Sequence, residues 1–237
     1  MKPIFIIFLV FGFFSCEVSN NEKETKNHMD TTDVVKENPQ KDSIVDLPKK
    51  MEYDYDTTQW TDLHLLDSTI IIDMRYATTN NFVKEKMYDC GRCFLRPEVA
   101  RRVVQAHQQL QEGGLGLKML DCFRPRPIQQ KLWDKFQDPR YVTPPEKGSM
   151  HNRGAAVDLT IVDEEGNQLD MGTAFDFFGK EAHHAYMDLS EDVLRNRKLL
   201  KETMISVDLH PITTEWWHYS YKEKSYALSD MLWNCEN

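Results

Sequence analysis

No stretch of this chain is apolar for long enough to cross a lipid bilayer as a helix. The N-terminal apolar run from Ile4 to Phe14 falls short of the roughly 20 residues that a membrane-spanning helix needs. Because Lys2 precedes this run, it is typical instead of the hydrophobic region of a secretory signal. We therefore expect contact with a membrane only through the N-terminus.

The chain also has no basic stripe. It carries 29 Lys and Arg residues against 38 Asp and Glu residues, which gives a formal net charge of −9. Proteins that bind nucleic acids neutralise phosphates with Lys and Arg, so an acidic chain is a poor candidate for that function. We expect no nucleic-acid partner, and the acidity does not identify a substrate.

Aromatic residues are missing from residues 17–50, which are rich in Asn, Glu, Lys, Asp and Thr. Such a segment cannot bury enough apolar surface to offset the entropy lost on ordering. We expect a signal peptide in residues 1–15 and a flexible tether in residues 16–50. Ser15 before Cys16 resembles a bacterial lipoprotein processing site, with Cys16 lipidated. An ordinary secretory signal is the alternative.

Cysteine is scarce, and apart from Cys16 the chain has only Cys90, Cys93, Cys122 and Cys235. In an oxidising envelope, an even number favours up to two disulfides, and the sequence leaves all pairings open. The close spacing of Cys90 and Cys93 would also suit a metal or redox site. Because the two remaining cysteines are scattered, structural disulfides or buried thiols are the favoured interpretation.

Hydrophobic patterns in residues 51–237 indicate one domain that mixes helices and strands. Apolar runs predict strands at 68–76, 117–122, 155–161 and 215–221. Helical spacing predicts helices over 97–112, from Pro127, and after Ser190 as an N-cap. We expect an α+β fold with a small, mostly antiparallel sheet and flanking helices.

Residues suited to chemistry gather in two short segments. The first, from Ser149 to Asp158, reads Ser-Met-His-Asn-Arg-Gly-Ala-Ala-Val-Asp, and the second, from Glu215 to His218, reads Glu-Trp-Trp-His. Together they supply two imidazoles, one carboxylate ligand and a spare carboxylate. A catalytic zinc site needs the same set, namely three protein ligands, an open position for water and a general base.

These segments resemble the motif of the zinc D-alanyl-D-alanine dipeptidases, a group within the zinc D,D-peptidases. Further blocks follow in that family's order, so that the resemblance covers about residues 52–234. The blocks are Tyr76-Ala77-Thr78 with Asn81-Phe82, Phe123-Arg124-Pro125, Met171-Gly172 with Phe175-Asp176-Phe177, and His183-His184-Ala185. The resemblance implies hydrolysis of D-Ala-D-Ala to two D-alanines in peptidoglycan metabolism. The expected lipid anchor and tether indicate that the protein resides in the bacterial cell envelope, on its periplasmic side.

The resemblance also implies a role for individual residues. His151, Asp158 and His218 map onto the ligands of one Zn²⁺ ion per chain. Glu215 maps onto the general base for the attacking water that the zinc activates. Arg124 maps onto an arginine that stabilises the oxyanion, and the alternative is that it pairs with a structural carboxylate.

Four more residues map onto the pocket for the dipeptide. Asp176 matches the position that holds the substrate ammonium, and Ser149 matches a pocket hydroxyl. Tyr76 and Tyr88 match tyrosines that close over a small ligand, with plain aromatic packing as the alternative.

The position of Glu215 raises a geometric question. In a regular strand, Glu215 and His218 would face opposite sides of the sheet, so a bulge, a strong twist or the start of the strand must re-aim one of them.

Two other functions deserve comparison. A zinc D,D-carboxypeptidase acting on longer peptidoglycan stem peptides needs an open cleft with no anion facing the substrate N-terminus, and Asp176 argues against it. The other is a catalytically inactive zinc- or cell-wall-binding module. The presence of Glu215 and Arg124 argues against this second alternative.

Overall fold

The computed structural model describes residues 53–235. The expected signal peptide, Cys16 and the expected tether all lie outside these residues. The helices are α1 (Leu63–Leu66), α2 (Pro97–Gln111), α3 (Arg126–Lys135) and α4 (Glu191–Ser206), with 3-10 turns η1 (Arg75–Ala77), η2 (His151–Arg153) and η3 (Lys180–Ala182). Within the described part of the chain, no helix has the length and apolar character needed to cross a membrane.

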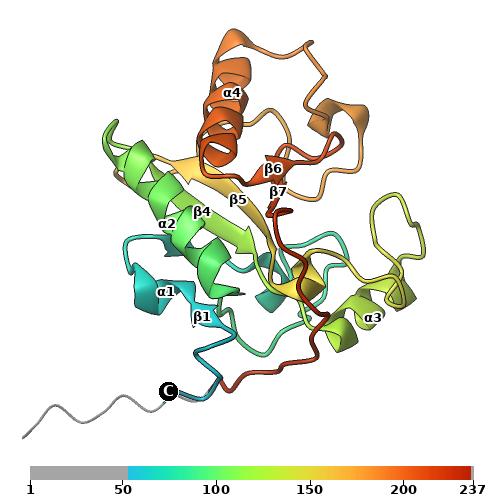
Figure 1. The fold of residues 1–237 in the computed structure, drawn as a ribbon. Coiled ribbons are helices and arrows are strands. Elements are labelled where there is room, and N and C mark those ends of the chain that lie inside the picture. The colour runs from blue at the N-terminus through green and yellow to red at the C-terminus, as the bar shows by residue number, and fades with distance from the viewer. Residues whose placement is uncertain (1–52, 236–237) are drawn as a thin grey trace, which may run out of the picture. The chain divides into compact units, whose positions relative to one another are not determined.

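A five-stranded sheet forms the centre of the fold, with its strands in the order β2-β4-β5-β7-β6 (Figure 1). These strands are β2 (Ile71–Ile72), β4 (Gly116–Asp121), β5 (Ala156–Val162), β6 (His210–Pro211) and β7 (His218–Ser220). Only β2 and β4 run parallel, and the other neighbours are antiparallel. A separate antiparallel pair consists of β1 (Thr61–Asp62) and β3 (Phe94–Leu95). The predicted α+β fold with a mostly antiparallel sheet is confirmed.

The core forms where α2 packs against the central strands. Every residue of β5 is buried, and the apolar stripe of α2 is buried with it. The stripe comprises Val99, Ala100, Val103, Ala106 and Leu110. α2 packs on β4 and on α4, and α4 also contacts β5 and β6, so two helices far apart in sequence lie next to each other on the sheet (Figure 1). This rigid layer holds β5, which carries one of the candidate metal ligands.

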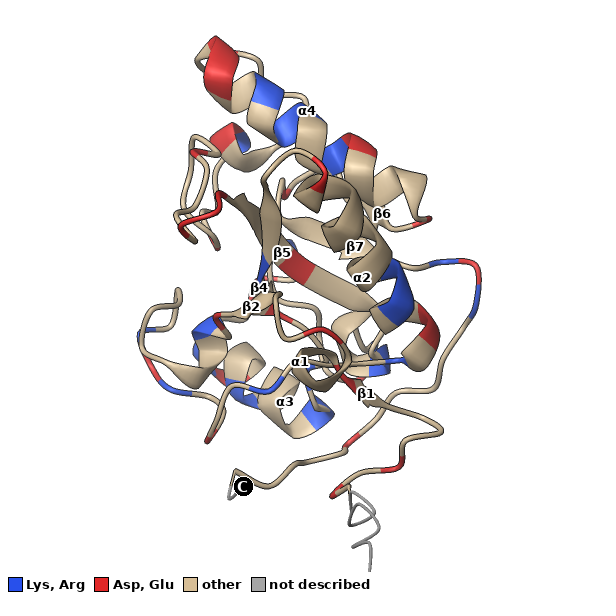
Figure 2. Ribbon diagram, turned by 90° about the vertical axis from the view of Figure 1, so that its left-hand side faces the viewer, with Lys and Arg blue, Asp and Glu red and all other residues tan. Residues whose placement is uncertain are grey.

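The helix ends follow from local chemistry. α2 has Pro97 at its first position, where the missing N–H costs no helical hydrogen bond. The hydroxyl of Ser190 accepts a hydrogen bond from the amide of Val193 at 3.3 Å, so the predicted N-cap of α4 is confirmed. Glu191 and Asp192 occupy the first turn of α4, where the helix dipole favours negative charge. Figure 2 shows the charged residues of this helix.

Two predicted strands are shorter than expected. The strand predicted at 68–76 pairs with β4 only at Ile71 and Ile72, and the chain then turns into η1. The strand predicted at 215–221 is β7, which pairs with β5 from His218 to Ser220. Bends at 216–217 precede β7. Apolar and aromatic content alone therefore overestimated the length of both strands.

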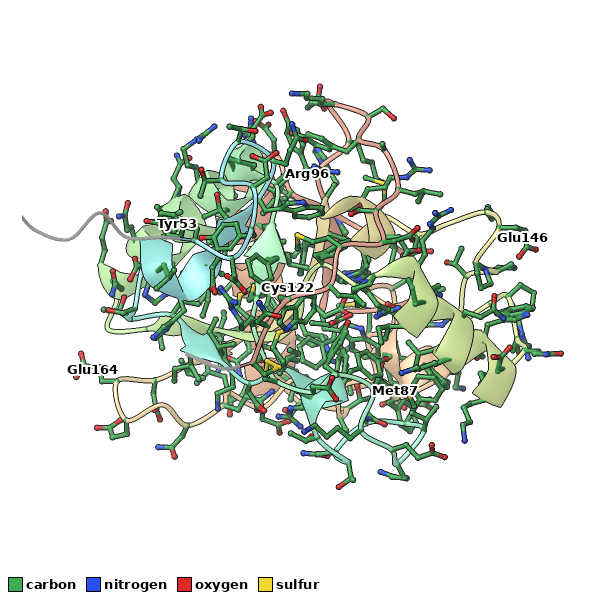
Figure 3. The ribbon with its side chains drawn as sticks, turned by 90° about the horizontal axis from the view of Figure 1, so that it is seen from below. Tyr53, Met87, Arg96, Cys122, Glu146 and Glu164 are labelled. Atoms are coloured by element: carbon green, nitrogen blue, oxygen red, sulfur yellow. A yellow bond between two sulfur atoms is a disulfide. The ribbon has the colours of Figure 1, made fainter. Side chains whose placement is uncertain are left out.

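The cysteines form two disulfides, Cys90–Cys235 and Cys93–Cys122. The two closely spaced cysteines therefore do not pair with each other. One bridge ties the C-terminal segment to the loop before β3, and the other ties that loop to the end of β4. Cys122 lies near the centre of the molecule in Figure 3 and is fully buried.

Candidate metal centre and active site

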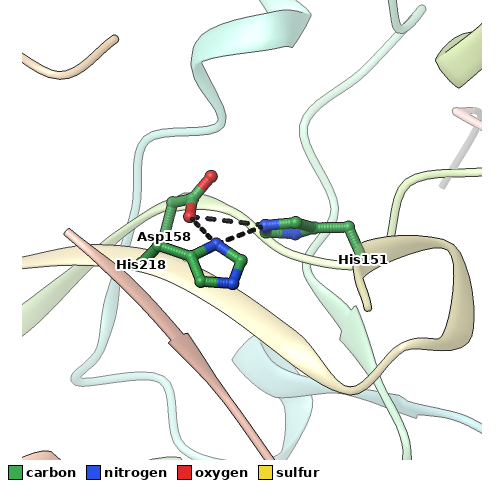
Figure 4. A group of neighbouring side chains, drawn as sticks. All are labelled: His151, Asp158 and His218. Atoms are coloured by element: carbon green, nitrogen blue, oxygen red, sulfur yellow. Dashed lines mark hydrogen bonds and ion pairs between the residues drawn. The ribbon is translucent and has the colours of Figure 1, made fainter. Parts of the chain in front are cut away.

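His151, Asp158 and His218 bring three ligand atoms to one point (Figure 4). His151 Nε2 lies 3.1 Å from His218 Nδ1 and 3.3 Å from Asp158 Oδ1. His218 Nδ1 lies 3.0 Å from the same carboxylate oxygen. The structure therefore brings together the three residues that the motif predicted to be ligands.

The fold explains this convergence. Asp158 on β5 and His218 on β7 are direct partners across the antiparallel pair, so their side chains share one face. His151 lies in η2, immediately before β5. Gly154 then reverses the chain with a φ of 67°, a conformation in which a side chain is strained. A Cβ at Gly154 would also clash with the ring of Trp60, which explains glycine there on both counts.

The geometry of the three atoms fits a tetrahedral metal ion. Ligand atoms bound at about 2.0–2.1 Å to a tetrahedral zinc lie roughly 3.3 Å apart. The observed separations of 3.0 to 3.3 Å are close to that value. Two imidazoles and one carboxylate are also a donor set that zinc binds readily, with a fourth position left for water.

Neighbouring groups prepare two of these residues for metal binding. His151 Nδ1 lies 2.7 Å from the carbonyl oxygen of Cys122, so the Nδ1–H tautomer donates there and leaves Nε2 free to ligate. Burial by itself would raise the pKa of Asp158, but the adjacent His151 and His218 outweigh it and hold the pKa well below its ordinary value. Asp158 is therefore the ionised carboxylate that a metal requires.

Glu215 faces the same cavity, which has a volume of about 300 Å³. The residue precedes β7, and the bends at 216–217 remove the alternation that a regular strand would impose. This resolves how Glu215 and His218 reach one site. Burial raises the pKa of the Glu215 carboxyl to about 7; the positive charge of His218 opposes the shift and the negative charge of Asp158 adds to it. A general base at neutral pH needs a pKa near that value.

Arg124 also lines the cavity, from the turn that follows β4. Its Nε and Nη2 donate to Asp121 Oδ2 at 3.0 and 2.5 Å, and its Nη1 donates to Gln129 Oε1 at 3.0 Å. The guanidinium carbon lies 4.9 Å from the centre of the Tyr76 ring. Arg124 therefore pairs with a buried carboxylate, the alternative weighed from the sequence, and faces the cavity as well.

The remaining predicted pocket residues separate into two groups. Asp176, Tyr76 and Ser149 line the cavity, and the Tyr76 hydroxyl donates to Asp176 Oδ2 at 3.0 Å. Tyr88 does not reach the cavity, and its hydroxyl instead donates to Asp121 Oδ1 at 3.2 Å, behind Arg124. Tyr88 thus supports the arginine and packs among aromatic rings, as its alternative interpretation had it.

Asp176 is held in an unfavourable environment. Burial raises the pKa of its carboxyl well above the ordinary value, and the negative charge of Asp158 adds to that effect. The charge of Arg124 and the hydrogen bond from Tyr76 lower the pKa but do not cancel the shift. Its φ of 61° is a left-handed conformation that few residues other than glycine adopt. Strain of this kind is found at ligand sites, where the surrounding structure enforces it.

The sequence did not identify Asp121 and Gln129 as part of the site. Asp121 is fully buried, next to the Arg124 turn, and Gln129 projects from the first turns of α3. The position of Asp121, at the end of a strand and three residues before Arg124, was the one available signal.

Comparison with known proteins agrees with this geometry. The model of the family Peptidase M15, D-Ala-D-Ala dipeptidase, matches residues 56–234. The D-alanyl-D-alanine dipeptidase of Escherichia coli (strain K12) is 34% identical over 181 residues, which are 76% of this chain and 94% of that protein. The D-alanyl-D-alanine dipeptidase of Enterococcus faecium is 28% identical over 178 residues, 66% of this chain and 88% of that protein.

Among solved structures, a vancomycin resistance D,D-pentapeptidase in complex with Zn(II) aligns with 54% of this chain and 73% of its own length. The identity is 15% and the TM-score 0.38. The family assignment depends on the sequence comparisons, whose matched region contains every residue of the metal cluster and cavity. The chain belongs to the Peptidase M15 family of D-Ala-D-Ala dipeptidases.

Proposed function

We propose that this protein is a zinc dipeptidase that hydrolyses D-Ala-D-Ala to two D-alanines in peptidoglycan metabolism. The observation that carries the proposal is the three-atom ligand cluster with Glu215 beside it in one small cavity. A volume of about 300 Å³ lies at the lower end of the range for small-molecule pockets and suits a dipeptide. The function of the family's named members supports the same substrate.

His151, Asp158 and His218 would hold one zinc ion. The bound zinc supplies Lewis-acid chemistry, activating water and polarising the scissile carbonyl. The hydrogen bond from His151 Nδ1 to the Cys122 carbonyl already aims Nε2 at the cluster, and Asp158 is already ionised, so these two ligands need little rearrangement when the metal enters.

Glu215 is the proposed general base and acid. Its carboxylate accepts a proton from the attacking water as the water oxygen bonds to the carbonyl carbon. It then donates that proton to the amide nitrogen as the carbon–nitrogen bond breaks, so each turnover restores the carboxylate. A pKa near 7 lets one group do both at neutral pH.

Arg124 would stabilise the negative charge that develops on the carbonyl oxygen. Asp121 and Gln129 occupy only part of its hydrogen-bonding capacity, since Nη1 and Nη2 each carry one further N–H. The same bonds hold the guanidinium still, and a preorganised donor costs less to align during the reaction than a mobile one.

Asp176 would bind the substrate ammonium. A buried carboxylate with a raised pKa lacks compensating positive charge, and an ammonium group would supply it. The bond from Tyr76 fixes one carboxylate oxygen and leaves the other for the ligand. Ser149 would contribute a hydroxyl on the wall of the cavity.

We also propose that the protein works in the bacterial cell envelope, on the periplasmic side, anchored through a lipid on Cys16. Two disulfides support an oxidising compartment outside the cytoplasm. An enzyme there meets dipeptide released from the cell wall, which favours recovery of D-alanine. Metabolic labelling with a fatty acid would test the anchor, and a Cys16→Ser variant labelled as strongly as the parent would contradict it.

The experiment that tests the activity is D-alanine release by the zinc-loaded protein from three substrates. These are D-Ala-D-Ala, its N-acetyl derivative and a stem pentapeptide. We expect cleavage of the free dipeptide only, because Asp176 needs an ammonium to pair with. Cleavage of the pentapeptide would instead indicate a D,D-carboxypeptidase and would contradict the role of Asp176.

A further inference from the structure

The cationic side chains that line the active-site cavity are Arg124, Arg140 and Lys147. Arg124 is committed to the buried carboxylate of Asp121, and Arg140 donates from Nε to Asp138 at 2.9 Å. Within residues 53–235, the Lys147 ammonium forms no ion pair and no side-chain hydrogen bond. The Lys147 side chain is exposed, and it is the one cavity-lining Lys or Arg of the described chain that pairs with no carboxylate.

The anions of the cavity surround the metal cluster. Asp158, the proposed ligand, Glu215, the proposed base, and Asp176, the proposed ammonium site, all line the cavity. A free dipeptide is a zwitterion, so its second charge, the C-terminal carboxylate, needs a cation. Because the peptide bond must lie at the metal, the carboxylate must lie on the other side of the metal from Asp176. Because Arg124 is the proposed donor to the carbonyl oxygen, Lys147 is the lining cation that remains for the carboxylate.

The backbone at Lys147 is held in place. The amides of Lys147 and Gly148 both donate to the carbonyl of Pro144, at 3.0 and 3.1 Å. Gly148 has a φ of 68°, and a Cβ there would clash with Leu228. The preceding Glu146 lies at the outer edge of the molecule in Figure 3 and does not line the cavity. The long lysine side chain thus starts from a fixed turn just before Ser149.

We propose that Lys147 determines specificity by binding the C-terminal carboxylate of the dipeptide. This inference rests on the proposed function and names the residue that recognises the second end of the substrate. Asp176 and Lys147 together select a ligand whose ammonium and carboxylate lie on adjacent residues. A substrate extended or capped at its C-terminus would lose the contact with Lys147 and keep the contact with Asp176.

The test compares D-Ala-D-Ala with its C-terminal amide, which keeps the ammonium and the scissile bond but carries no carboxylate. We expect Lys147→Met to raise KM for the dipeptide about tenfold, or about 1.4 kcal/mol, with kcat within about twofold. KM for the amide should not change, and Lys147→Arg should retain most of the affinity. Calorimetry of dipeptide binding to the zinc-loaded Glu215→Gln protein, with and without Lys147→Met, measures the same loss without turnover.

Lys131→Met is the matched control, since Lys131 is an exposed lysine of α3 that does not line the cavity. It should leave KM for both substrates unchanged. Equal effects of Lys147→Met on dipeptide and amide, or no effect on either, would overturn the inference while the dipeptidase activity stands. A parent protein that cleaves neither substrate would overturn the proposed function itself, and this inference with it.

Discussion

The support of Arg124 by Asp121 gives the sharpest quantitative prediction. Both carboxylate oxygens of Asp121 are used, one by Arg124 and the other by the hydroxyl of Tyr88. The Asp121 side chain is completely buried and the Arg124 side chain is 10% exposed. Asp121→Asn keeps the shape of the side chain, removes its charge and leaves a buried guanidinium unpaired.

Removing one partner of a buried ion pair costs about 3–5 kcal/mol, mostly because the other charge stays buried. For a domain of this size, that loss corresponds to a fall in Tm of about 10 °C. The bonds that aim the guanidinium also lose their charge assistance and weaken, so we expect kcat/KM for the dipeptide to fall about 10²-fold, as when one oxyanion donor is removed.

Calorimetric melting and D-alanine release, the latter measured well below the melting temperature, would test both numbers. Asp230→Asn is the matched control, because Asp230 accepts from the same two donors of an arginine, Nε and Nη2 of Arg126, but on the exposed surface. It should change neither Tm nor activity, since exposed ion pairs contribute little. If Asp121→Asn behaved like Asp230→Asn, the argument that burial makes this pair important would be refuted.

Two further predictions concern stability. The chain-entropy model gives about 3.6 kcal/mol for the Cys93–Cys122 bridge and about 5 kcal/mol for Cys90–Cys235. Replacing either pair with alanine should lower the free energy of unfolding by about these amounts. Only loss of Cys93–Cys122 should also weaken zinc binding, because the Cys122 carbonyl orients the ligand His151. Competition with a chelator would measure that affinity. Separately, burial lowers the pKa of His184 to about 4 from 6.5, and nearby cations add to the effect. The His184 imidazole takes up a proton near pH 6.5 in the unfolded chain but only near pH 4 in the folded protein. His184 therefore contributes stability that is fully present above pH 6.5 and is lost as the pH falls toward 4. His184→Gln should flatten that decline in urea titrations, and an unchanged slope would contradict the assignment.

The sequence predicted the metal cluster well because its spacing reflects local structure. Two of the ligands lie within one turn-and-strand unit from His151 to Asp158, where a glycine at 154 signals the reversal. The third ligand is a cross-strand partner, which the family motif supplied. The helices were also predictable, since their apolar stripes and capping residues are local signals.

The supporting residues were harder to predict because their roles depend on tertiary contacts. Asp121 is recognisable only once β4 brings it beneath Arg124, and Tyr88 reaches it from a distant loop. The disulfide pairing likewise follows from which segments meet in space. The short β7 shows the same limit, since aromatic content predicted a longer strand and the bends at 216–217 ended the pairing.

The most direct test of the account compares the parent protein with Glu215→Gln, each loaded with zinc and assayed for metal content and D-alanine release. Glu215 is not a ligand of the cluster, so both proteins should bind one zinc per chain. The parent should cleave D-Ala-D-Ala, and the variant should be slower by about 10³-fold through loss of the base. A variant that binds zinc and cleaves the dipeptide at the parent's rate would contradict the central claim.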